Sequence, residues 1–265
     1  MAHTTSINRI ERLFAGDSRN LLSVYFTAGF PSAEDTLDIA RALDQAGADI
    51  IEIGMPFSDP IADGPTIQQS NNTALKNGMT IKRLFGQLEH LRDEVEVPVI
   101  LMGYINPVLQ FGIDAFCEKC RETGVDGLIL PDLPMAEYLA HYKDKFDAYG
   151  LKNIFLITPQ TSEERIREID AHSDGFIYMV SSASTTGARN SIGEQQLAYF
   201  ERISQMELRN PTLVGFGISN NETFSTACRY SNGAIIGSAF IRVLQENGAS
   251  QEAIKNFIED IKNSK

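Results

Sequence analysis

The stretch Gly47-Ala-Asp-Ile-Ile-Glu-Ile-Gly54 shows the pattern that decides the fold of this 265-residue chain. Glycine is the common residue at the end of a helix, and the short apolar run after it is typical of a buried strand. Similar junctions recur at residues 124–128, 172–176 and 230–234. The repeat predicts one strand–helix unit used many times, without a linker between halves.

Eight apolar runs rich in β-branched residues are predicted to be parallel strands. They span residues 21–27, 49–53, 97–102, 127–130, 153–157, 175–180, 212–216 and 234–236. Amphipathic helices are expected between them, for example over 81–91 and 254–261, and an additional one at 7–14. We therefore predict an α/β fold, a (β/α)8 TIM barrel with an extra N-terminal helix, as one domain over residues 1–265. An open doubly wound sheet is the alternative, although residues 27–31 lack its usual glycine fingerprint.

The composition excludes several classes of protein. Hydrophobic residues make up 43% and charged residues 22%, so neither a disordered chain nor a disulfide scaffold is expected. The formal net charge is −12, and the sequence shows no basic face of the kind that binds nucleic acid. Three cysteines favour a reducing compartment, and no signal or membrane-spanning run is visible. We expect a cytoplasmic protein that binds neither nucleic acid nor membrane.

Glu52 is a carboxylate within an otherwise apolar strand. Side chains alternate between the faces of a strand, so Glu52 points away from Ile51 and Ile53. If it points into the barrel, burial would raise its pKa and suit it to acid–base chemistry near neutral pH. The alternative is a structural glutamate paired with an arginine.

A long proline- and glycine-rich loop follows that strand, over residues 54–65. Loops of this length at the mouth of a barrel are usually functional. It contains Asp59 and Asp63, which could instead only form turns with the residues that follow them. We take Asp63 as the candidate for a second functional carboxylate.

The loops after the sixth, seventh and eighth predicted strands consist largely of small residues and contain glycines. Residues 181–190 offer little apolar surface for burial, so we predict that they form a mobile lid. The alternative is a plain flexible connector. Residues 215–219 and 236–239 follow the seventh and eighth strands, where barrels often bind phosphate on backbone N–H groups. The pattern favours a phosphorylated ligand, and tight turns are the alternative.

Other chemistries have little support in the sequence. No lysine lies at the C-terminal end of a predicted strand, which argues against a Schiff-base aldolase. The four histidines lack ligand spacing, so no metal site is expected. Cys117 and Cys120 share a predicted helical face with Phe116, which is typical of a core rather than of a redox pair. Carboxylates and backbone dipoles then remain as the catalytic groups.

The segment Glu52-Ile-Gly-Met-Pro-Phe-Ser-Asp-Pro-Ile-Ala-Asp-Gly-Pro-Thr-Ile-Gln68 resembles the signature of the tryptophan synthase α chain family. The similarity extends over nearly the whole chain, through residues 25–29, 101–104, 130–134 and 237–238. The resemblance implies a lyase of tryptophan biosynthesis that splits indole-3-glycerol phosphate into indole and glyceraldehyde 3-phosphate. It implies no cofactor on this chain.

The resemblance also implies roles for the candidate residues. Glu52 would move the protons at the ring carbon and the side-chain hydroxyl, while Asp63 would hold the ring N–H and stabilise its charge. Tyr178 would line the pocket, and Thr186 of the lid would contact Asp63 on closure. The substrate phosphate would lie on the backbone of Gly187, Gly217, Gly237 and Ser238.

The family works as an α2β2 heterotetramer whose β chain carries pyridoxal phosphate, so the implied partner is a β chain. It would dock near Pro56, Asp59 and Asp132. The family's lid usually reads Ser-Arg-x-Gly-Val-Thr-Gly, whereas residues 181–187 read Ser-Ser-Ala-Ser-Thr-Thr-Gly. Two other hypotheses stay open: a catalytically weak subunit that mainly binds and activates a β chain, and a phosphosugar isomerase on the same barrel.

Overall fold

The computed structural model describes residues 7–60, 63–181 and 192–263, and these contain nine parallel strands in one sheet. The strands are β1 (Leu21–Thr27), β2 (Ile50–Gly54), β3 (Val99–Met102), β4 (Gly127–Ile129), β5 (Lys152–Asn153), β6 (Phe155–Ile157), β7 (Ile177–Val180), β8 (Thr212–Gly215) and β9 (Gly233–Ile236). Their order is β5-β4-β3-β2-β1-β9-β8-β7-β6. Only Ile154 separates β5 from β6, and its N–H donates to the carbonyl of Leu128 at 2.9 Å. The two ends of the sheet therefore meet in a nearly closed barrel, which confirms the eight predicted strands and excludes the open sheet.

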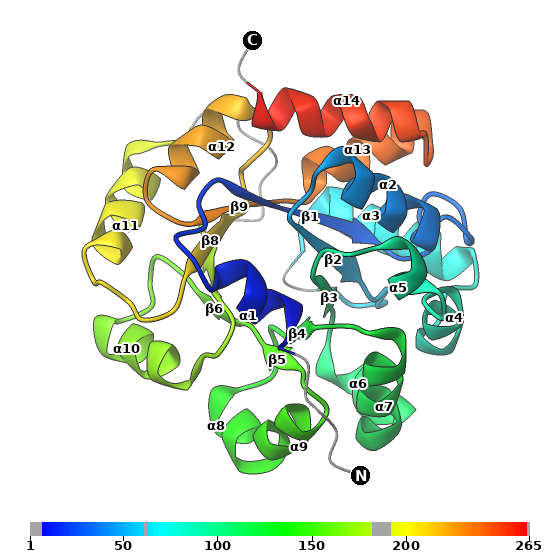
Figure 1. The fold of residues 1–265 in the computed structure, drawn as a ribbon, viewed down its shortest axis with the longest axis horizontal. Helices are drawn as coiled ribbons and strands as arrows, with labels where there is room; N and C mark the ends of the chain where they lie inside the picture. The colour runs from blue at the N-terminus through cyan, green and yellow to red at the C-terminus, as the bar shows by residue number, and fades with distance from the viewer. Residues whose placement is uncertain (1–6, 61–62, 182–191, 264–265) are drawn as a thin grey trace.

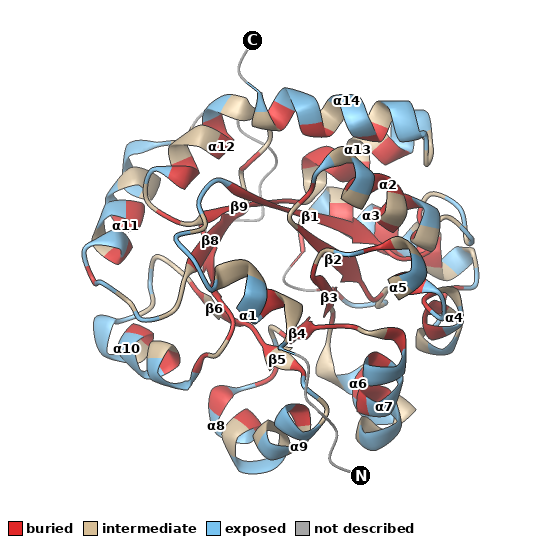
Figure 2. Ribbon diagram, viewed as in Figure 1, coloured by how far each residue is buried: buried red, intermediate tan, exposed pale blue. Residues whose placement is uncertain are grey.

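Helices surround the barrel (Figure 1). They are α1 (Arg9–Phe14), α2 (Thr36–Ala46), α3 (Pro65–Lys76), α4 (Ile81–Gln87), α5 (Leu91–Glu94), α6 (Ile105–Phe111), α7 (Ile113–Thr123), α8 (Met135–Glu137), the π-helix η1 (Tyr138–Tyr142), α9 (Lys143–Ala148), α10 (Glu163–His172), α11 (Glu194–Ser204), α12 (Asn221–Cys228), α13 (Ser238–Asn247) and α14 (Gln251–Lys262). Their buried sides face the strands and their exposed sides face outward (Figure 2). No helix in the described ranges is long and apolar enough to cross a membrane.

The predicted helix over 81–91 is wrong in one respect, because α4 and α5 are two separate helices. The chain turns after Leu88, and the N–H of Leu91 donates to the Leu88 carbonyl at 3.0 Å. Both leucines are nevertheless fully buried. Apolar spacing thus identified the buried side chains but not the break in the backbone.

The repeated junction has a structural reason. Gly47 and Gly124 end α2 and α7 in the left-handed region, with φ of 93° and 78°. In three of the four junctions, the Asp or Asn at the third position accepts from a backbone N–H of the preceding strand unit, whereas Asp174 bonds to the side chain of Lys152. The three bonds are Leu22 N–H to Asp49 (2.7 Å), Val99 N–H to Asp126 (2.9 Å) and Thr212 N–H to Asn232 (3.1 Å). The repeat fixes how neighbouring strands start relative to one another.

The barrel interior is filled from alternate strand positions, and α1 covers one end of it (Figure 1). Ile10 of α1 is fully buried in the interior cluster, and the rings of Phe14 and Phe176 lie 5.9 Å apart. Helix α1 confirms the predicted N-terminal helix, but Ile7 lies before its cap Asn8 and is 65% exposed. Because α1 closes the end where the strands begin, the opposite end is left for a site.

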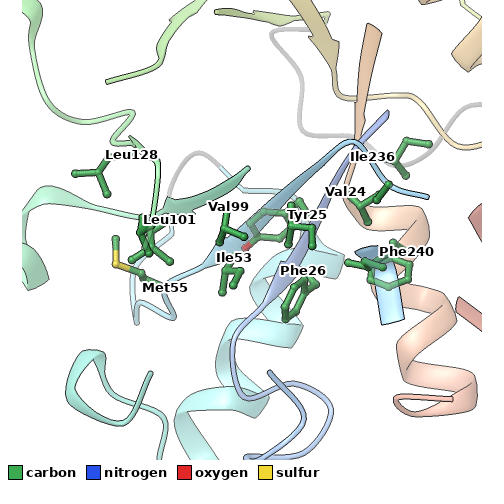
Figure 3. Packing of buried hydrophobic residues seen from close by; sticks show 14 of the residues in the cluster. Val24, Tyr25, Phe26, Ile53, Met55, Val99, Leu101, Leu128, Ile236 and Phe240 are labelled. Atoms are coloured by element: carbon green, nitrogen blue, oxygen red, sulfur yellow. The ribbon is translucent and has the colours of Figure 1, made fainter. Parts of the chain in front are cut away.

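A second apolar cluster lies between the strands and the outer helices. Val24 of β1, Ile236 of β9 and Phe240 of α13 lie close together there (Figure 3). Cys117 and Cys120 on α7 belong to the same cluster and are fully buried. This confirms the prediction that they are core residues.

Candidate active site

Glu52 lies in the barrel interior, on the same face of β2 as Ile50. It is 0% exposed, and its Oε1 accepts a hydrogen bond from Ser23 Oγ at 2.7 Å. Burial raises the pKa of Glu52 to about 7, although the bond from Ser23 acts in the opposite direction. Within the described residues Glu52 has no ion pair and its Oε2 has no hydrogen-bond partner, so the arginine-paired alternative is wrong.

Asp63 lies at the start of α3, next to the helix cap Gly64. Its backbone is held in place, since its N–H donates to the Pro60 carbonyl at 3.1 Å and its carbonyl accepts from Gln68 Nε2 at 2.9 Å. The residue is 9% exposed, and burial raises its pKa to about 6. Asp59 of the same loop is exposed and bonds to Ser58. The loop therefore buries one of its two acids, the one that the sequence singled out.

A pocket opens beside Asp63 at the end of the barrel away from α1. Its lining residues come from β1, β3, α3 and the segments that follow β2, β3 and β4: Tyr25, Met55, Asp63, Asn71, Met102, Gly103, Tyr104 and Pro131. Asn71 is buried, and within the described ranges its Oδ1 has no hydrogen-bond partner. The wall is thus mostly apolar, with a carboxyl and an amide among its polar groups.

Two buried tyrosines connect the carboxyl groups. Burial raises the pKa of Tyr178 well above its usual value, and the nearby charges of Glu52 and Asp63 raise it further. The pKa of Tyr25 is raised by burial first and then by the same two acids. Glu52 and Asp63 therefore lie close enough to Tyr178 for both charges to act on its phenol.

Glycines make room for these phenols. A Cβ atom at Gly54 would lie 2.2 Å from the hydroxyl of Tyr25, and one at Gly215 would lie 2.2 Å from the hydroxyl of Tyr178. Neither distance is tolerable for a side chain. Gly215 of the predicted seventh-strand loop thus makes room for the Tyr178 phenol.

Three of the predicted phosphate residues lie at the ends of β8 and β9. Gly217 has φ of +79°, and Gly237 is the cap of α13, whose first residue is Ser238. A Cβ at Gly237 would lie 3.4 Å from Cδ1 of Tyr25, so this helix start adjoins the pocket wall. Free backbone N–H groups at a helix N-terminus attract anions. The predicted Thr186 and Gly187 lie outside the described residues.

Sequence reasoning missed Ser23, Tyr25 and Asn71. Ser23 and Tyr25 could have been found from the sequence. They lie two and four positions after Leu21 on the same strand, so their side chains point with Leu21 into the barrel. Asn71 gave no such signal. It reaches the pocket only because α3 packs across the strand ends.

Comparisons with known proteins agree with this geometry. A sequence model of the tryptophan synthase alpha chain family matches residues 13–264. The tryptophan synthase alpha chain of Christiangramia forsetii is 57% identical over 256 residues, covering 97% of this chain and 99% of the relative.

Solved structures show the same likeness. The tryptophan synthase subunit alpha of Legionella pneumophila has a TM-score of 0.85 at 33% identity, covering 97% of this chain and 98% of that chain. A chain of M. tuberculosis tryptophan synthase in an aminoacrylate-bound form has a TM-score of 0.82 at 27% identity, covering 96% of this chain and 98% of that chain. The chain therefore belongs to the tryptophan synthase alpha chain family, whose members cleave indole-3-glycerol phosphate in tryptophan biosynthesis.

Proposed function

We propose that Glu52 and Asp63 divide the chemistry of the α reaction, in which indole-3-glycerol phosphate is split into indole and glyceraldehyde 3-phosphate. The observation that carries this proposal is the burial of two carboxyls with raised pKa values: Asp63 lines the pocket, and the charges of Asp63 and Glu52 both act on Tyr25, which lines it too. Enzymes that need an acid and a base near neutral pH commonly bury carboxyls in this way.

Glu52 moves the protons. Its protonated carboxyl donates to the ring carbon that carries the side chain, which leaves positive charge on the ring and a carboxylate on Glu52. That carboxylate then accepts the proton of the side-chain hydroxyl while the carbon–carbon bond breaks. The bond electrons return to the ring, and the oxygen becomes the aldehyde. A pKa of about 7 lets Glu52 serve in both directions at neutral pH.

Asp63 holds the ring N–H. A pKa of about 6 leaves its carboxyl mostly ionised near pH 7, when Glu52 is still partly protonated. An ionised acceptor opposite the ring nitrogen stabilises the positive charge that forms after protonation. We therefore assign the acid with the lower pKa, Asp63, as the charge stabiliser and Glu52 as the proton carrier.

Binding energy comes from the rest of the substrate. Tyr178 and the apolar wall contact the indole ring, while the backbone of Gly217, Gly237 and Ser238 holds the phosphate, together with Gly187. Thr186, which lies outside the described residues, keeps the role that the family resemblance implies for it. Such remote contacts orient the reacting atoms.

The partner is a tryptophan synthase β chain, in an α2β2 heterotetramer. Asp59 and Asp132 are exposed near the pocket mouth, and Asp132 accepts from the N–H of Ile105, at 3.0 Å to Oδ1, which ties two mouth loops together. We place this surface in the interface, with pyridoxal phosphate only on the β chain and no cofactor here. A cytoplasmic location fits three free, buried cysteines.

The test is cleavage of indole-3-glycerol phosphate by the purified chain, alone and with a β chain. We expect Glu52→Gln and Asp63→Asn each to lower kcat at least about a hundredfold, the scale of lost acid–base catalysis. Asp59→Asn, an exposed acid in the same loop, is the matched control and stays near normal when the chain is assayed alone. Normal turnover in either buried-acid variant would remove that residue from the mechanism.

The same assay separates the other hypotheses. A parent chain that binds the β chain tightly but cleaves nothing in either assay would be a binding and activating subunit. Turnover of a phosphosugar without cleavage of the indole substrate would favour the isomerase, which family membership already disfavours. The α2β2 stoichiometry is tested by the mass of the mixed complex in solution.

A further inference from the structure

We propose that Ser23 is a positioning residue for Glu52: it holds one carboxyl oxygen, so that only the other oxygen exchanges protons with the substrate. This inference rests on the proposed role of Glu52. It assigns a task to a residue of β1 that neither the sequence pattern nor the family resemblance singled out.

The geometry of the pair is the first step. Ser23 and Glu52 are both 0% exposed, and Ser23 Oγ lies 2.7 Å from Glu52 Oε1. In the register of β1 with β9, Ser23 stands opposite Ile235 of the interior cluster, so its side chain belongs inside the barrel. The bond is therefore shielded from water, where a hydrogen bond to a charged group is strong.

The two carboxyl oxygens differ in their surroundings. Oε1 accepts from Ser23, whereas Oε2 has no partner in the part of the chain that the structure describes. A buried polar atom without a partner lowers stability, and one explanation for its presence is a catalytic role. Oε2 is thus the carboxyl oxygen that the described residues leave without a hydrogen bond.

The chemistry follows from that asymmetry. A serine hydroxyl that donates to Oε1 favours a neutral carboxyl whose proton is on Oε2. When Glu52 has given up this proton, the hydroxyl stabilises the carboxylate and lowers its pKa. Ser23 therefore fixes both which oxygen carries the proton and how readily it leaves.

Other groups that face Glu52 do not explain this effect. Tyr25 on β1 and Tyr178 on β7 lie near it, but burial raises the pKa of both phenols, so they stay neutral in the relevant range. Asp63 titrates near pH 6 and is the same in parent and Ser23 variants. A change on replacing Ser23 therefore reports the bond to Glu52.

The experiment is the pH dependence of indole-3-glycerol phosphate cleavage by the full chain, with a β chain present. In Ser23→Ala, we expect the alkaline limb of kcat/KM to move up by about one pH unit, because the carboxylate has lost a donor. We expect kcat to fall about tenfold with little change in KM, the scale of a misplaced catalytic group. Ser23→Thr, which keeps the hydroxyl, restores the limb and kcat.

Two further variants keep the result interpretable. Ser23→Cys retains the size with a weaker donor and should move the limb in the same direction if Ser23→Ala folds poorly. Ser231→Ala also removes a buried hydroxyl, which bonds to the carbonyls of Ala227 and Gly233, and should lower stability without moving the limb.

The inference is overturned if the alkaline limb of Ser23→Ala stays in place, or if Ser231→Ala moves it equally. If the Ser23 inference fails in this way while Glu52→Gln is inactive in the same assay, the proposed function still stands. If Glu52→Gln keeps its activity, both the inference and the role of Glu52 are wrong.

Discussion

The Glu52 carboxyl should make the protein less stable as the pH rises, and Glu52→Gln should remove this dependence. Its pKa is about 7 in the folded protein and 4.5 ordinarily, so the folded state keeps a proton that the unfolded chain releases. The contribution is fully present below pH 4.5 and is lost as the pH rises through 7. Between about pH 5.5 and about pH 8.5 the unfolding free energy should lose about 2 kcal/mol from this group.

The measurement is urea unfolding of the parent and of Glu52→Gln at both pH values. Because glutamine does not titrate, the free energy of the variant minus that of the parent should rise by about 2 kcal/mol from the lower to the higher pH. Asp63 titrates in both proteins, so its contribution largely cancels. Glu246→Gln, an exposed glutamate of α13, is the control and should show a constant difference. If the difference for Glu52→Gln is also constant, the claim that burial raises the pKa of the Glu52 carboxyl is refuted.

Three further predictions concern the structures that support the site. Gly215→Ala places a Cβ 2.2 Å from the hydroxyl of Tyr178, so the phenol must move, and we expect kcat/KM for cleavage to fall at least about tenfold; an unchanged value would contradict the proposed pocket wall. Ile10→Ala opens a cavity in the barrel floor and should cost about 2–5 kcal/mol of unfolding free energy, measured in urea, while a cost below about 1 kcal/mol would mean that α1 does not seal the barrel. Asp126→Asn removes a buried carboxylate whose Oδ2 lies 2.6 Å from the half-buried Arg92, and we expect a loss of about 3 kcal/mol in the same assay; a neutral effect would show that the pair is not needed.

Much of the fold could be predicted from local pattern. The run at Ile50–Gly54 and its seven counterparts are mostly apolar, which is typical of strands covered on both faces. The Gly-x-Asp junctions were also visible, but their purpose was not. Only the register shows that Asp49 and Asp126 cap the backbone of the neighbouring strand unit.

The sequence allowed the candidate catalytic residues to be identified, but not their burial or their pKa values. Glu52 stood out because a carboxylate in an apolar strand is rare, and Asp63 was a candidate because of the length of its loop, but its burial was not predicted. Their raised pKa values depend on how much water the packed barrel excludes, which is a property of three-dimensional surroundings. Asn71 and Ser23 could not be assigned for the same reason, since each is defined by a partner or pocket distant in sequence.

The sequence by itself determined the alternation of strands and helices and the candidate acids, because hydrophobic period and turn residues act over a few neighbouring positions. The closure of the barrel was favoured by the sequence but decided by the meeting of β5 and β6 in the structure. Only the tertiary structure decided that β1 presents Ser23 to Glu52 and that α3 brings Asp63 and Asn71 to one pocket. Those contacts span from 8 to 29 positions along the chain or join separate elements. They arise from packing and register, which no local pattern encodes.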